Sequence, residues 1–259
     1  MRIYSWNALF SNKELPRAAS FIQEAPWDIF CLQEVSEDFL AQLKQLPCSI
    51  AYATEADRNF KGKRSSQYIV ILSRHPIQGE GALSLPLHEG QLLVRSKIFV
   101  WVMFHLGLWA RSVDNRNSVY ADIEMPGGLM RVFSLHLPLL NPKHRAEELA
   151  LALDRRESIP SIICGDFNVL ESFKVTLLNW IFGGSLADWF SIRRERRNME
   201  KTFALHGLKN PLLGRTTHPF SRSQLDHILV PVSAKITAVG VSKDRYGSDH
   251  CPVWVDCEI

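Results

Sequence analysis

Short polar motifs stand at the ends of apolar runs at five points along this 259-residue chain. A continuous apolar run is typical of a strand that is buried on both faces of its sheet. Polar side chains at the ends of such strands converge in a crevice, where ligands bind. The motifs are Asn7 after residues 3–6, Glu34 after 29–33, Asp166 and Asn168 after 162–165, Asp226-His227 before 228–230, and Asp249-His250 before 253–255.

The length fits one large domain or two small ones, and the 46% hydrophobic content is enough for a sizeable core. No stretch rich in Gly, Ser or Pro divides the chain, so we expect one domain over residues 1–259. A net charge of +3 permits a phosphate-bearing partner without arguing for one. Five cysteines with no CxxC pair, and no signal-peptide pattern at the start, predict a reduced, cytoplasmic chain.

Hydrophobic periodicity and chain breakers predict a mixture of strands and helices. Two half-patterns resemble each other, since a strand that ends in an acid precedes a helix near Glu34 and again near Asp166. Such halves favour two mixed sheets packed face to face with helices outside. The expected strands are 2–7, 28–34, 67–73, 118–125, 129–136, 160–165, 225–230, 234–241 and 252–257, and the expected helices 14–24, 36–46, 143–156 and about 172–183, with Arg145, Glu147 and Glu148 pointing outward.

Glu34 and Asp249 are candidate metal ligands, because carboxylates at strand ends suit Mg²⁺, which takes a few oxygen ligands and keeps several waters. Surface acids that simply end strands are the alternative for each, and Asn7 fits an ordinary turn equally well. Asp166 and Asn168 are more specific, since Gly165 permits an unusual turn before them. A carboxylate there can orient or deprotonate water, and an amide can donate to a phosphoryl oxygen; an Asx turn is the alternative.

His250 needs a partner that orients its ring before it can act as an acid or a base, and Asp226 is the candidate. His136 ends an apolar strand and is placed to hold a phosphate oxygen, although a structural histidine fits that position as well. Strand alternation turns His227 to the face opposite Asp226, so we leave it out of the site.

Six motifs in this order resemble the signature of the endonuclease/exonuclease/phosphatase superfamily, the deoxyribonuclease-I-like hydrolases. The resemblance covers almost the whole chain and implies a four-layer αββα sandwich with Mg²⁺- or Mn²⁺-dependent cleavage of phosphoester bonds. It implies that Asn7, Glu34 and Asp249 form the metal site. It also implies that Asp166 and Asn168 position the nucleophile and stabilise the phosphoryl group, that His136 contacts the phosphate, and that Asp226 orients His250. The motifs are Ser5-Trp6-Asn7, Leu32-Gln33-Glu34, Ser134-Leu135-His136-Leu137, Gly165-Asp166-Phe167-Asn168, Leu225-Asp226-His227-Ile228 and Ser248-Asp249-His250.

Residues 88–115 look inserted relative to that signature, and 98–109 within them lack any alternation of apolar and polar residues. This stretch is shorter than the ~18 apolar residues that a membrane-spanning helix needs. We favour a buried strand pair or crossover that completes the core. The alternative is an exposed apolar hairpin or helix that makes a peripheral membrane contact.

Two basic clusters, one at 58–64 and one at 193–197, suit contact with a phosphate backbone but fit a solvated surface equally well. The favoured function is a monomeric, nuclease-like phosphodiesterase, with nucleic acid a stronger substrate candidate than lipid. A phospholipid phosphodiesterase or a phosphoinositide phosphatase is the alternative within the same chemistry. A catalytically dead relative that binds nucleic acid or protein is the alternative of another class. Clustered carboxylates repel one another and reduce stability when no metal is bound. A catalytically dead relative would be free to lose them, so their presence argues against this last alternative.

Overall fold

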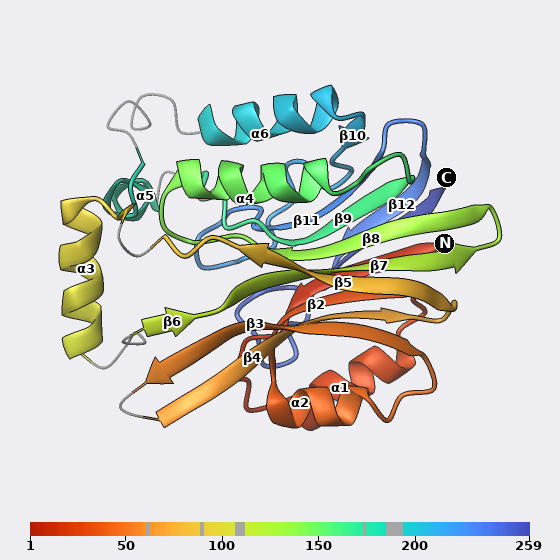
Figure 1. Ribbon diagram of the computed structural model, residues 1–259, viewed down its shortest axis with the longest axis horizontal. Coiled ribbons are helices and arrows are strands. Elements are labelled where there is room, and N and C mark those ends of the chain that lie inside the picture. The colour runs from red at the N-terminus through yellow and green to blue at the C-terminus, as the bar shows by residue number, and fades with distance from the viewer. Residues whose placement is uncertain (61–62, 89–90, 107–111, 173–174, 185–193) are drawn as a thin grey trace.

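The computed structural model describes residues 1–60, 63–88, 91–106, 112–172, 175–184 and 194–259. Its described strands form two sheets, stacked face to face between two pairs of helices (Figure 1). This four-layer arrangement is the predicted αββα sandwich.

The first sheet runs in the order β12-β13-β1-β2-β4-β3-β6. Its centre pairs β1 with β2 in parallel, and β13 and β4 join them antiparallel. The strands are β1 (Arg2–Asn7), β2 (Ile29–Ser36), β3 (Ser49–Phe60), β4 (Lys63–Ser73), β6 (Ser112–Asp114), β12 (Lys235–Val241) and β13 (Val253–Glu258).

The second sheet runs in the order β10-β11-β9-β8-β7-β5. Its β8 and β9 are parallel neighbours, and this places His136 beside Asp166 in the register. On the other side of β9, the antiparallel strand β11 places Asp226 beside Asp166. The strands are β5 (Ile77–Leu85), β7 (Arg116–Met125), β8 (Gly128–His136), β9 (Ser161–Asp166), β10 (Leu208–Lys209) and β11 (Asp226–Pro231).

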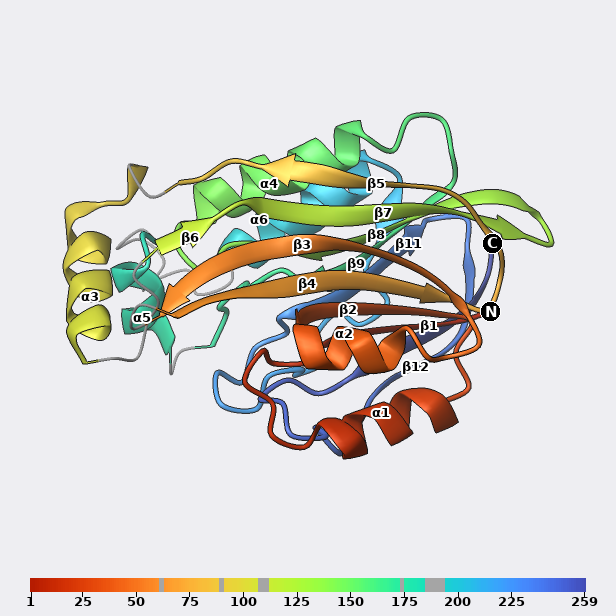
Figure 2. The ribbon, with the colours of Figure 1, turned by 60° about the horizontal axis from the view of Figure 1, so that its bottom comes forward.

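The helices cover the outer faces of the sheets and one end of the sandwich. Helices α1 and α2 lie on the first sheet and α4 and α6 on the second, while α3 and α5 lie at the end opposite the two termini (Figures 1 and 2). The Ser36 hydroxyl caps α2 by accepting from the Phe39 amide at 3.3 Å. The helices are α1 (Leu15–Glu24), α2 (Glu37–Leu43), α3 (Val94–His105), α4 (Pro142–Asp154), α5 (Thr176–Ile181) and α6 (Arg194–Leu205).

The interior forms three apolar layers, because each central strand buries both of its faces. Ile3 and Ile162 belong to the layer between the sheets, and Trp6 belongs to the layer under α1 and α2. Phe167 belongs to the layer under α4 and α6. A smaller cluster that includes Phe182 lies at the α3 and α5 end.

Two side chains predicted to point outward from α4 are instead fully buried. Arg145 donates to both carboxylate oxygens of Glu195, at 2.6 and 2.9 Å, and Glu148 accepts from Arg116 at 2.9 Å. A helix packed only against a sheet would leave these two side chains in solvent. Helix α4 also contacts α6 and the segment after β5, and these neighbours bury them. Only Glu147 keeps a partly exposed carboxylate, as predicted.

The apolar stretch at 98–109 does not form the predicted buried strand pair or crossover. Its described part comprises residues 98–105 of α3 and Leu106, and here the Trp101 side chain is 62% exposed and Ile98 58%. A sequence of consecutive apolar residues is compatible with a helix as well as with a strand. Without an alternation of apolar and polar residues, it does not indicate which side chains are buried and which are exposed. Residues 107–109 of this prediction lie outside the described part of the chain. No helix among the described residues is long and apolar enough to cross a membrane.

Candidate active site

A large cavity, of about 1340 Å³, opens where the ends of the central strands from both sheets meet. Every sequence-predicted site residue except Asp226 lines it, and Asp226 lies directly behind His250. Loop residues and the end helices supply the rest of the wall. The polar side chains that line it include Asn7, Glu34, Arg58, His136, Asp166, Asn168, His218, Asp249 and His250.

Glu34 reaches the cavity because β2 is interrupted there. The register of β2 against β4 shifts between Leu32 and Val35, and Glu34 adopts a positive φ of 53°. Such bulges redirect a side chain beside active sites, and a non-glycine residue in this region marks backbone strain that the surroundings hold in place. Its carboxylate accepts from the Phe10 amide at 3.3 Å and from Asn7 Nδ2 at 3.4 Å.

Asp166 lies at the centre of the site. Its Oδ2 accepts from Asn7 Nδ2 at 3.0 Å, and the Nε2 atoms of His136 and His250 both lie 3.6 Å from that oxygen. Burial raises the pKa of Asp166, against the opposing effect of the two rings. Gly165 is required just before it, because a Cβ there would lie 1.9 Å from the Leu135 carbonyl oxygen of the parallel neighbour.

His250 and Asp226 form the predicted pair, with Nδ1 of the ring 2.9 Å from Asp226 Oδ2. Burial opposes the charged ring, but the attraction of Asp226 and then Asp166 outweighs it and raises the pKa of His250 to about 10. The Ser248 hydroxyl holds the loop, since it accepts from the His250 amide at 3.0 Å and donates to the Asn7 carbonyl at 2.7 Å.

A second histidine–carboxylate pair, which the sequence reasoning missed, faces Asp166 from the other side. Glu55 lies in a register shift of β3 and its Oε1 is 2.6 Å from His136 Nδ1. Its Oε2 accepts from the backbone amide of Glu34 at 2.9 Å. Burial lowers the pKa of His136, but Glu55, Asp166 and Glu34 together raise it to about 9. A lone acid among the small and apolar residues of 50–56 was the available signal for Glu55.

Asn168 forms the Asx turn that the sequence offered as one of its two interpretations. Its backbone amide donates to Asp166 Oδ1 at 2.9 Å, which is an Asx turn, and its φ is 52°. Its Nδ2 donates to the Leu137 carbonyl at 2.9 Å, and the side chain lines the cavity. The turn therefore presents an amide group beside the carboxylate.

His227 stays out of the site, as strand alternation predicted. Its ring stacks on Phe167 with centroids 4.4 Å apart, and it contacts the Arg196 guanidinium on the outer face of the sheet. Burial and then Arg196 lower the pKa of His227 well below its ordinary value. Arg196 itself is buried and paired with Glu171 at 3.0 Å, so this member of the 193–197 cluster does not offer a surface charge. Arg193 and Lys61 lie outside the described residues.

Two groups of side chains in the described part of the chain have the spacing of a metal site. His218, Asp249 and His250 keep their ligand atoms within 4.8 Å of one another at the cavity. So do His88, His144 and Glu147, of which the two histidines line the cavity. His218, another residue that the sequence reasoning missed, lies 3.6 Å from Asp249 Oδ2. Burial would raise the pKa of Asp249, but His218 and His250 lower it to about 2.

The oxygen donors around the cavity fit a hard divalent ion. The Glu34 carboxylate is ionised, because Arg58 at 3.9 Å and His136 more than offset the effect of burial and lower its pKa. Asp249 lines the same cavity with a half-exposed carboxylate. Carboxylate oxygens that line a cavity suit Mg²⁺ or Mn²⁺ better than a soft metal.

Comparison with known proteins agrees with this geometry. A sequence model of the Endonuclease/Exonuclease/phosphatase family matches residues 4–250. No curated protein matches the chain. Among solved structures, a family protein from Leptotrichia buccalis superimposes with a TM-score of 0.68 at 16% identity, covering 100% of both chains.

Two further similar structures are of proteins with named activities. The mannosyl-6-phosphatase from Bacteroides thetaiotaomicron and the Neisseria 3′ phosphatase bound to a product DNA hairpin each superimpose with a TM-score of 0.59 at 18% identity, and 100% of both chains is covered in each comparison. At this identity the likeness shows the shared fold. The family match over nearly the whole chain shows more: the protein belongs to the endonuclease/exonuclease/phosphatase family and is a phosphoester hydrolase of the metal-dependent type.

Proposed function

We propose that this enzyme hydrolyses a phosphodiester whose alcohol portion is apolar, with a phospholipid as the substrate class. One observation carries the choice of substrate: the cavity is polar at the strand ends and apolar beyond them. Its far wall continues over α3, α5 and the segment after β8. The apolar lining there comprises Leu92, Val100, Trp101, Phe104, Leu139, Leu140, Leu170, Val175, Leu178 and Phe182.

The site residues supply the chemistry on the phosphate. Asp166, with its raised pKa, is placed to take a proton from the attacking water. The two imidazolium rings of His136 and His250 flank it, and they stabilise charge on the phosphoryl oxygens or return a proton to the leaving oxygen. Asn168 adds an amide donor on the same side.

Glu34, Asp249 and Asn7 are the proposed metal ligands, with Mg²⁺ or Mn²⁺ as the ion. When bound, the ion would polarise the phosphoryl group and stabilise the charge that develops on oxygen. The Asn7 amide nitrogen already bridges the two acids Glu34 and Asp166, which orders this part of the site.

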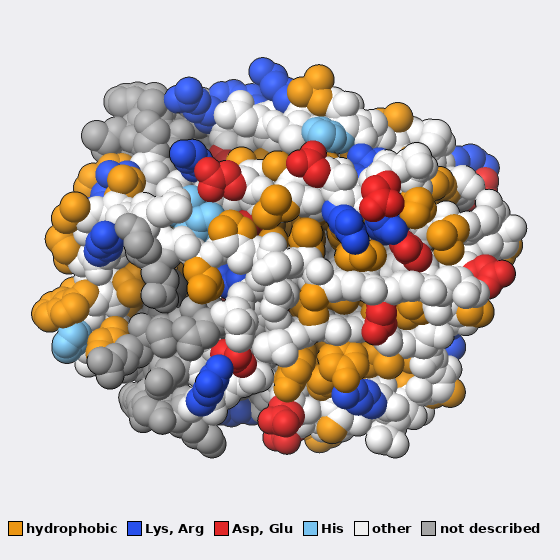
Figure 3. Space-filling view, in the orientation of Figure 1, with side chains coloured by type: hydrophobic (Ala, Val, Ile, Leu, Met, Phe, Trp, Pro, Cys, Tyr) orange, Lys and Arg blue, Asp and Glu red, His pale blue; other side chains and the backbone are white. Residues whose placement is uncertain are grey.

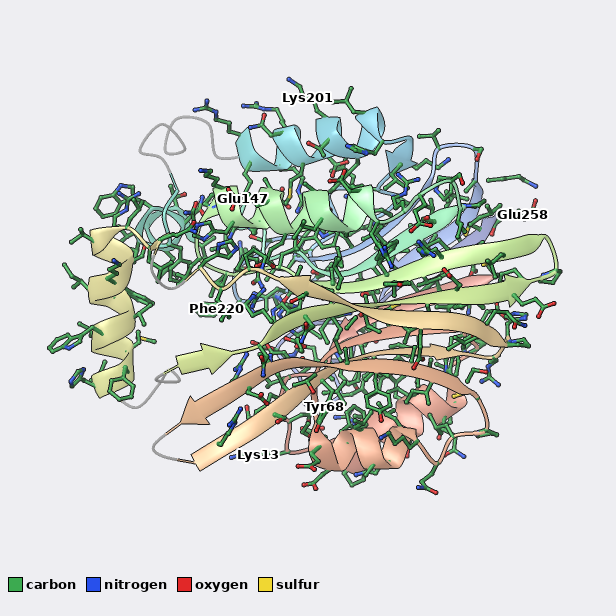
Figure 4. All side chains as sticks on the ribbon, in the orientation of Figure 1. Lys13, Tyr68, Glu147, Lys201, Phe220 and Glu258 are labelled. Atoms are coloured by element: carbon green, nitrogen blue, oxygen red, sulfur yellow. The ribbon has the colours of Figure 1, made fainter. Side chains whose placement is uncertain are left out.

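A nucleic acid, which the sequence favoured, is the second candidate. Arg58 beside Glu34 offers a cation within the cavity, and Phe220 at the cavity is 79% exposed and suited to stacking on a base (labelled in Figure 4). The apolar far wall does not complement a polyanion, so we place this candidate second.

The test is an assay of the purified chain with Mg²⁺ or Mn²⁺ against short single- and double-stranded DNA, RNA, a phosphoinositide, sphingomyelin and glycerophospholipids. Preferred hydrolysis of a phospholipid supports the proposal, and preferred hydrolysis of a nucleic acid overturns it. A chain that binds these molecules without cleaving any of them would be the catalytically dead relative. Gel filtration on the same preparation checks the expected monomer.

A further inference from the structure

Exposed apolar side chains gather on the outward face of α3. Val94 is 74% exposed, Ile98 58%, Trp101 62% and Leu106 65%. The first three follow a spacing of four and then three residues, so they share one face of the helix. Figure 3 shows this hydrophobic patch at the edge of the molecule, and Figure 4 shows side chains of α3 projecting away from the body.

The inward face of α3 is firmly attached, so the exposure does not come from an undocked helix. Ser96 Oγ donates to the Ile181 carbonyl at 2.7 Å, and Arg95 donates to the carbonyls of Trp180 and Gly184, each at 2.7 Å. The rings of Phe99 and Phe182 pack edge to face with centroids 5.2 Å apart. Helix α3 therefore holds its apolar outer face at a fixed place beside the cavity.

Charge indicates what covers this face. No acidic residue occurs between Gln91 and Val113, and Lys97 is an exposed basic residue of α3. An apolar helix face with a tryptophan, an exposed lysine and no acidic residue complements the interface of an anionic bilayer. Aromatic residues such as Trp101 prefer that boundary, because the ring is largely apolar and carries one polar N–H.

The position of α3 at the cavity favours a bilayer over a second copy of the chain. Val100, Trp101 and Phe104 line the cavity from this same helix. A protein partner seated on α3 would cover this wall, whereas a bilayer would deliver its own phosphodiester there. We propose, resting on the lipid-directed function above, that α3 docks on an anionic lipid bilayer and opens the apolar end of the cavity toward it.

The test compares two matched double variants on vesicles of phosphatidylcholine with phosphatidylglycerol. Val94→Ser/Ile98→Ser removes exposed apolar side chains of α3 that do not line the cavity. Leu205→Ser/Val232→Ser removes the same number elsewhere, from positions that are 85% and 55% exposed. Co-sedimentation should fall roughly tenfold in the α3 variant and stay at the wild-type level in the control variant.

The same proteins are assayed on bis(p-nitrophenyl) phosphate, a soluble phosphodiester. The α3 variant should keep wild-type hydrolysis of this compound and lose hydrolysis of vesicle lipid in proportion to its lost binding. Unchanged vesicle binding in the α3 variant, or no binding by the wild-type protein, overturns the docking proposal. So does a wild-type dimer in gel filtration that the α3 substitutions dissociate. Wild-type protein that binds vesicles but hydrolyses neither compound contradicts the proposed function instead.

Discussion

The two ends of the cavity are built in different ways. At the polar end, His136, Asp166 and Asp226 come from adjacent strands whose register is fixed by backbone hydrogen bonds. At the apolar end, α3 and α5 come from connections between strands and are attached mainly through side chains. Catalytic groups need positions defined by the rigid sheets, whereas substrate preference is carried by elements that vary without disturbing the chemistry.

The polar end contains two histidine–carboxylate pairs that can be compared directly. His250 with Asp226 and His136 with Glu55 approach Asp166 Oδ2 at the same distance of 3.6 Å. Each carboxylate lies behind its ring at Nδ1, at 2.9 and 2.6 Å respectively. The Asp226 pair was predicted from two sequence motifs 24 residues apart, whereas the pairing of Glu55 with His136 was recognised only in three dimensions.

Removing the metal should have the largest effect, because it acts on the polar end as a whole. EDTA should abolish hydrolysis of every substrate, and Mg²⁺ or Mn²⁺ should restore it. Glu34→Gln should lose activity that excess metal does not recover, since the amide is neutral. Initial rates on bis(p-nitrophenyl) phosphate measure both effects. Full activity of this variant in excess Mg²⁺ would exclude Glu34 as a ligand.

The next largest effect is expected for His250→Ala. General acid–base assistance typically contributes 10²–10⁴-fold, so kcat should fall at least ~100-fold with the fold intact. Circular dichroism checks the fold, and His206→Ala, at an exposed histidine after α6, is the matched control. A kcat within a few-fold of wild type would remove His250 from the chemistry.

Glu55→Gln tests whether the second pair matters as much as the first. The neutral amide no longer stabilises the charged His136 ring, so the pKa of His136 should fall from about 9. Losing a hydrogen bond to a charged group predicts a kcat reduction of about tenfold at neutral pH. The pH profile of kcat, measured beside Asp226→Asn, distinguishes this from misfolding. Identical pH profiles for Glu55→Gln and wild type would count against a positioning role.

Phe104→Ser probes the apolar end with a smaller expected effect. Phe104 lines the far wall, and part of its ring is already exposed. Losing this contact should raise KM for a substrate with an acyl chain by about fivefold, and much less for bis(p-nitrophenyl) phosphate. Steady-state kinetics on the two substrates give the ratio. An equal change for both would mean that the wall does not contact the apolar group.

The smallest effect concerns the stability of the sheet behind the site. The folded pKa of His227 lies well below its value of about 6.5 in an unfolded chain. Below pH 6.5 the unfolded state therefore binds a proton that the native state does not, and stability falls as pH drops, by at most about 1.4 kcal/mol per pH unit. Denaturant unfolding at pH 7, 6 and 5 should show a flatter dependence for His227→Gln. Parallel curves for the two proteins would refute this.

The sequence by itself determined the sandwich and most of the polar end. Continuous apolar runs fixed which segments become central strands, and a polar residue at the end of such a run has to face the crevice or solvent. This is why Asp166, His136 and the Asp226–His250 pair were predictable. Gly165 was readable for the same local reason, because only glycine allows the backbone to pass so close to its parallel neighbour.

The tertiary structure alone decided what depends on distant partners. Glu55 belongs to the site because it contacts His136, 81 residues away in the sequence. Arg145 is buried because its guanidinium pairs with Glu195 of α6. The prediction for 98–109 was wrong over its described residues, 98–106, for the same reason. Apolarity measures a preference to leave water, but whether a core, a cavity or a membrane satisfies that preference depends on the neighbours that the rest of the chain provides.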